Sequence, residues 1–69
     1  MNKLKLNKKI YEIETLIKAV NDYQHLVDIR IQDEMNYYLL TFIHCEYEAA
    51  ETIKEFENYL IGLTYQSIK

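Results

Sequence analysis

His44 and Cys45 stand side by side after the third apolar segment of this chain. A thiolate paired with an imidazolium is a common enzymatic nucleophile. We expect a β-strand here, and neighbouring side chains of a strand point to opposite faces of the sheet, so these two cannot pair while the strand continues. We therefore interpret Cys45 as a small, semi-buried residue at a strand-to-helix junction and His44 as a polar strand end. The sequence predicts no catalytic residue.

A metal site built from the two histidines has little support. His25 and His44 have neither the i, i+4 nor the His-Xaa-His spacing that typical sites use, and we expect them in structural or solvated roles. Cys45 is the single cysteine, which excludes an internal disulfide and a zinc site made from cysteine pairs. We expect no metal and no cofactor.

The last third of the chain is acidic between Glu46 and Glu57. A glycosidase-type carboxylate pair needs two acids across a cleft, and a chain of this size offers no deep cleft. A solvated helix face is our main interpretation. The alternative is that these acids, with Asp33 and Glu34, imitate nucleic-acid phosphates and block a nucleic-acid-binding protein, as an acidic phage- or plasmid-type inhibitor does.

Lysines near the amino terminus alternate with leucines, as in Lys3-Leu4-Lys5-Leu6. This period of two is typical of a half-exposed edge strand, where lysines protect the edge from unwanted pairing. The same edge can accept an extended peptide by strand addition. We therefore take Lys3 and Lys5 as candidate partner-binding residues.

The seven tyrosines of the chain can supply a protein interface, because tyrosine gives a large contact area at low entropy cost. Tyr37 and Tyr38 open the third apolar segment on opposite faces, so we expect at least one to be exposed. Tyr47 is a further candidate. For any single tyrosine, the simpler interpretation is a side chain that covers the core with its hydroxyl in water.

The elements that must position these residues follow from hydrophobic periodicity. We predict a first strand over Lys3–Leu6, a helix over Glu12–Gln24, and a hairpin of strands Val27–Ile31 and Tyr37–Ile43 joined by a turn. The last strand is apolar at almost every position except Thr41, so either both of its faces are covered or it lies in the middle of the sheet, and the middle is the simpler interpretation. The sequence does not establish whether the first strand pairs with it.

The first predicted helix buries one stripe and exposes the opposite side. Its predicted core residues are Ile13, Leu16, Ile17, Val20 and Tyr23.

A second helix follows Glu46, with Gly62 as a weakening or C-cap and a frayed tail over Thr64–Lys69. Its predicted stripe comprises Ala49, Ala50, Ile53, Phe56, Tyr59, Leu60 and Leu63. The predicted fold class is α+β, a single domain over residues 1–69 with the order β-α-β-β-α, a three-stranded sheet and two helices.

Composition narrows the functional classes. A net charge of −3 argues against general nucleic-acid binding. The longest apolar run is far shorter than the ~20 residues that span a bilayer, and the first residues are not followed by a signal-peptide core. We expect a cytoplasmic protein with no membrane or nucleic-acid partner.

Two helical segments resemble a known family. Tyr11 to Tyr23 carries YEIETLIKAVNDY, and Glu55 to Leu63 carries EFENYLIGL, with Ala19 and Asn58 as the more specific positions. Together they resemble the small His-Xaa-Ser system protein D (HxsD-like) family, over about Leu4 to Tyr65. That family is associated with radical S-adenosylmethionine (radical SAM) enzymes of peptide-modification systems that make RiPPs. The resemblance implies an accessory subunit whose partner is a radical SAM enzyme or its precursor peptide.

The sequence thus predicts a non-catalytic binding module, not an enzyme, that recognises a peptide or protein partner. The alternatives are the acidic inhibitor and a small structural homodimer. The candidate partner-binding residues are Lys3, Lys5, Tyr37, Tyr38, Tyr47 and Asn58.

Overall fold

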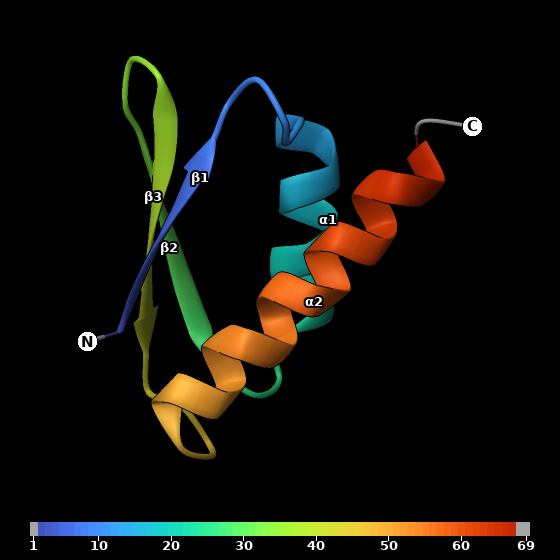
Figure 1. Ribbon diagram of the computed structural model, residues 1–69. Helices are drawn as coiled ribbons and strands as arrows, with labels where there is room; N and C mark the ends of the chain where they lie inside the picture. Colours follow the sequence, from blue (N-terminus) through green and yellow to red (C-terminus); the bar gives the residue numbers. More distant parts are fainter. Residues whose placement is uncertain (1, 68–69) are drawn as a thin grey trace.

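The computed structural model describes residues 2–67 and contains three strands and two helices (Figure 1). The order β-α-β-β-α and the α+β class are those predicted. The elements are β1 (Lys3–Asn7), α1 (Ile13–Asp22), β2 (Asp28–Asp33), β3 (Tyr37–Ile43) and α2 (Ala49–Ser67). Most boundaries lie within two residues of the prediction, and α2 differs most.

The sheet has the order β1-β3-β2, and both neighbouring pairs are antiparallel. β3 therefore lies in the middle, which confirms the placement predicted from its nearly continuous apolar sequence. β1 and β2 run parallel to each other on either side of β3, the arrangement called a split β-α-β unit. Both helices cover the same side of this sheet (Figure 1). Within residues 2–67 no helix or strand covers the opposite side, which carries Tyr37, Leu39, Thr41 and Ile43 of β3 and is called the open face.

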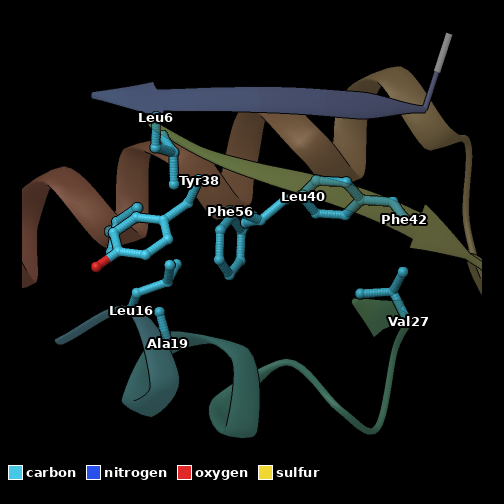
Figure 2. Packing of buried hydrophobic residues seen from close by; sticks show 9 residues of the cluster. Leu6, Leu16, Ala19, Val27, Tyr38, Leu40, Phe42 and Phe56 are labelled. Atoms are coloured by element: carbon cyan, nitrogen blue, oxygen red, sulfur yellow. The ribbon is translucent and has the colours of Figure 1, made fainter. Parts of the chain in front are cut away.

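The core lies between the helices and every second residue of the strands. Tyr38, Leu40 and Phe42 of β3 are buried, whereas the residues between them are half-buried. From α2, Phe56 is completely buried, and its ring makes an edge-on contact with Phe42 at a centroid separation of 5.4 Å (Figure 2). A second edge-on contact joins Phe56 to Tyr23, also at 5.4 Å. Such aromatic contacts add to the burial of apolar area that holds a small domain together.

The buried stripe of α1 differs from the prediction. Ile13 and Ile17 are 40% and 47% exposed, whereas Leu16 and Ala19 are completely buried. The stripe is centred on Ala19 because its small side chain lets the backbone of α1 approach the core closely. The helical spacing predicted Leu16 on the buried stripe correctly, but its placement of Ile13 and Ile17 there was wrong.

The carboxyl-terminal half of α2 also corrects the prediction. The helix begins at Ala49 and continues through Gly62 to Ser67, so Gly62 is not a C-cap and residues 64–67 are helical. Predicted tail residues 68–69 lie outside the described residues. Ala50, predicted on the buried stripe, is exposed, whereas Thr52 is buried and its hydroxyl donates to the Glu48 carbonyl over 3.0 Å. That bond satisfies the hydroxyl and makes a polar residue tolerable in the core.

Candidate functional site

The outer edge of β1 carries backbone groups that the sheet does not use. Phe42 N donates to the Asn2 carbonyl over 2.8 Å, so this pair is a hydrogen-bonded position of the ladder between β1 and β3. Such positions recur at every second residue of an antiparallel strand. Lys3 and Lys5 therefore direct their N–H and C=O groups away from β3, and within residues 2–67 no strand pairs with that edge.

The side chains of these same lysines extend over the open face. Lys3 and Arg30 both lie opposite Thr41, one from each flanking strand. Lys5 Nζ lies 4.4 Å from the centroid of the Tyr37 ring, a cation–π distance. The open face thus combines a half-buried tyrosine with three cationic side chains, and one of these contacts the ring directly.

Charge differs between the two edges of the sheet. β1 contains lysines and no acid, whereas β2 begins at Asp28 and ends at Asp33. Lys8, just after β1, forms an ion pair with Asp33. Within the described part of the chain no ion pair neutralises Lys3 or Lys5. The β1 edge is therefore the cationic edge of a chain whose net charge is negative.

Three of the predicted partner-binding residues, Tyr38, Asn58 and Tyr47, lie apart from this edge. Tyr38 is only 9% exposed and belongs to the core, so it is not available to a partner, whereas Tyr37 on the opposite face is half-buried. It shares the helix-facing side of β3 with Leu40 and Phe42, because alternate side chains of a strand point the same way. Asn58 is exposed on α2, and α2 lies on the side of the sheet opposite Lys5 and Tyr37.

Tyr47 is 68% exposed in the loop between β3 and α2. It lines a cavity of about 280 Å³ together with Tyr23, Leu26, Thr52 and two acids of α2, Glu51 and Glu55. Burial raises the pKa of Tyr23, with a further contribution from the negative charge of Glu55. This cavity is separate from the open face, so the predicted residues do not form one continuous site.

His44 and Cys45 lie as predicted at the end of β3. Cys45 is half-buried against the core. His44 is exposed, has a φ of 55°, and its Nδ1 lies 3.0 Å from Asp28 Oδ2. The described residues contain no group of three histidine, cysteine or acidic side chains arranged to hold a metal ion.

A polar cluster of Lys18, Asp22 and Tyr59 joins α1 to α2, on the side of the sheet that the helices cover. Lys18 Nζ lies 2.8 Å from Asp22 Oδ2, and the Tyr59 hydroxyl donates to the same oxygen. Hydrogen bonds from Lys18 and Tyr59 lower the pKa of Asp22, and the same bonds raise the pKa values of Lys18 and Tyr59. Each of these shifts moves the pKa of the group further from neutral pH, whereas a general acid or base needs a pKa near the working pH. The cluster therefore suits helix docking rather than proton transfer.

Sequence reasoning missed two features of these surfaces. Arg30 lies on the open face because the pairing of β2 with β3 places it opposite Thr41. The alternation of β2 alone separates Arg30 from the half-buried residues of that strand, but the neighbours of Arg30 follow only from the register. The contact between Asp22 and Tyr59 joins residues far apart in the sequence, and no local pattern signals it.

No protein-family model, no curated protein and no solved structure matches this chain. Among the described residues, neither helix has the length and apolar character needed to cross a membrane.

Proposed function

We propose that this protein is a small, non-catalytic binding module that captures an extended peptide segment as a fourth strand on the outer edge of β1. The observation that carries the proposal is the pair of outward-facing backbone positions at Lys3 and Lys5, beside the open face. In strand addition, backbone hydrogen bonds supply affinity and adjacent side chains supply selection. The β1 edge offers free backbone groups at Lys3 and Lys5 together with the side chains of the adjacent open face.

The β1 edge suits a partner of different sequence better than a second copy. In an antiparallel pairing of β1 with the β1 of a second copy, lysines of both copies would lie on the same face of the joint sheet. Like charges directly opposite each other destabilise such pairs. A homodimer through this edge is therefore disfavoured relative to a peptide without lysines.

The acidic-inhibitor alternative needs one surface on which the acids of α2 form a row, and they do not share a surface. Glu51 and Glu55 line the cavity beside Tyr47. Glu57 lies two residues beyond Glu55, about 200° around the helix, so it belongs to another side of α2. Imitating a phosphate backbone calls for a regular row of charges, and these acids are divided between two sides.

The resemblance to the HxsD-like family supports a finer version of the proposal. In that version, the protein is a cytoplasmic accessory that presents a precursor peptide to a radical SAM enzyme. The chain has a single cysteine, and an iron–sulfur cluster is generally held by several, so the radical chemistry belongs to the partner.

A peptide display library selected against the protein tests the proposal. We expect enriched peptides to share an extended pattern, and Lys5→Pro to lose them, because proline removes the outward N–H that the peptide would accept from. Proline is tolerated on an edge strand where the N–H faces solvent, so the fold is expected to survive. The control is Lys5→Ala, which removes the lysine side chain but keeps the backbone N–H.

A second test leaves the protein unchanged. A selected peptide is synthesised with N-methyl groups at alternate residues, in two versions that block opposite edges of the peptide strand. One version should lose binding and the other should keep it. Equal binding of both versions, or of wild type and Lys5→Pro, would show that the peptide does not add to β1.

A further inference from the structure

The charge of the β1 edge carries a further inference, which rests on the proposed function. We propose that the peptide captured at β1 is acidic, with carboxylate side chains at alternate positions and an apolar side chain between them. Lys3 and Lys5 have no acidic partner in the described part of the chain, and Arg30 adds a third positive charge to the same face. The acids of the sheet lie on β2, where Asp28 shares the open face and contacts His44, and Asp33 lies on the helix-facing side and pairs with Lys8.

The register of the sheet defines the spacing of these carboxylates. Lys3 and Lys5 point their backbone groups outward, so the peptide residues opposite them form hydrogen-bonded pairs in an antiparallel ladder. Side chains of such a pair extend on the same face, about 5 Å apart at Cβ. Peptide residues two apart therefore meet Lys3 and Lys5 on the open face.

The residue between the two carboxylates meets a different surface. It lies opposite Leu4, which is half-buried and packs against the core on the helix-facing side of β1. An apolar side chain there would cover the exposed part of Leu4, whereas a charged one would lose water without gaining a partner. The recognised segment is thus an alternation of acidic and apolar residues.

Binding of capped synthetic peptides tests this inference. The probes are an alternating glutamate–valine peptide, its glutamine–valine counterpart and its lysine–valine counterpart, with acetyl and amide caps that remove terminal charge. We expect the glutamate peptide to bind about two- to tenfold more tightly than the glutamine peptide, from two cross-strand charge pairs. The lysine peptide should bind most weakly. The preference should shrink at high salt, which screens exposed charges.

Variants of the protein locate the preference. Lys3→Gln and Lys5→Gln should each reduce the preference for glutamate over glutamine, while Lys54→Gln, on exposed α2 surface, should leave it unchanged. All three lose one positive charge, so a general effect of net charge would appear in all of them. An equal loss in the Lys54→Gln variant would overturn the assignment to β1.

The outcomes separate this inference from the proposed function. If glutamate and glutamine peptides bind equally and Lys5→Pro abolishes both, strand addition stands and acidic selection is wrong. If the glutamate peptide binds and Lys5→Pro weakens it no more than Lys5→Ala does, charge attraction alone holds the peptide and strand addition is wrong. Slower amide hydrogen exchange at Lys3 and Lys5 in the complex is the expected sign of strand addition, and unchanged exchange there contradicts it.

Discussion

The hydroxyl of Tyr59 on α2 donates a hydrogen bond to Oδ2 of Asp22, the last residue of α1. The same oxygen lies 2.8 Å from Lys18 Nζ, one helical turn earlier on α1. Tyr59 thereby ties the end of one helix to the middle of the other, next to the ring contact between Tyr59 and Tyr23 at 5.6 Å. This polar contact sits at the margin of the apolar interface rather than within it.

Replacing Tyr59 by phenylalanine should lower Tm by a few degrees at neutral pH and flatten the pH dependence of stability. Asp22 has a pKa below its ordinary 3.8, so its stabilising effect is present above that pH and is lost as the pH falls through the folded-state pKa. Tyr59 has a pKa above its ordinary 10.0, so its effect is present below that pH and lost as the pH rises through the folded-state value. Thermal melts of the wild type and the variant from acid to alkaline pH measure the losses of stability at both ends of the pH range.

The matched control for Tyr59→Phe is Tyr65→Phe, since Tyr65 is 73% exposed at the end of α2. Its melting profile should coincide with that of the wild type at every pH. If Tyr59→Phe also melts like the wild type at acid and neutral pH, the contact with Asp22 contributes nothing to stability.

Replacing Gly62 by alanine should stabilise the protein. Gly62 lies inside α2 with an ordinary backbone conformation, and an added Cβ would have no heavy atom within 4 Å. Alanine is about 1 kcal/mol more favourable than glycine in a helix interior, which corresponds to a rise in Tm of about 4–8 °C for a domain of this size. Calorimetry measures it. A fall in Tm would indicate a helix that ends at Gly62 with left-handed backbone.

Replacing Phe56 by alanine should strongly destabilise the protein. The side chain is completely buried and contacts two other aromatic rings, and such a truncation costs about 3–5 kcal/mol. A chain of this length has a total stability of roughly 3–10 kcal/mol. Phe56→Leu keeps most of the apolar volume and should cost about 1–2 kcal/mol, with the midpoint of urea unfolding as the readout. Tyr65→Ala should change that midpoint little, and a Phe56→Ala variant whose midpoint equals that of Tyr65→Ala would contradict the placement of this ring.

The sequence predicted that β3 lies in the middle of the sheet because β3 is apolar at almost every position, and a central strand was the simpler of two explanations for that pattern. It did not separate Tyr37 from Tyr38, because which of two alternating faces the helices cover depends on how they pack and not on the strand. Ala19 was undervalued for a related reason: a small side chain carries a weak hydrophobic signal even where it allows the closest packing.

The candidate edge was predictable in part. Lys3 and Lys5 follow from the alternation of β1, and the register then shows that their backbone groups face outward. Arg30 and the division of charge between β1 and β2 depend on which strands pair, and this is a long-range property that local patterns do not encode. The extension of α2 beyond Gly62 depends likewise on packing, since Leu60 and Leu63 hold both sides of the glycine against the core.

Replacing His44 by glycine should raise the free energy of unfolding by about 1 kcal/mol. His44 has a φ of 55°, a left-handed conformation that costs residues with a Cβ about 1–2 kcal/mol and glycine almost nothing. The substitution also removes the contact with Asp28, but both side chains are largely exposed, at 78% and 66%, and exposed pairs of this kind contribute little. His44→Ala loses the contact and keeps the backbone strain, so it should not stabilise, and Asp28→Asn removes the contact alone. Urea unfolding of the three variants separates the two effects: if His44→Ala gains as much as His44→Gly, the gain comes from the lost side chain and not from relief at the backbone.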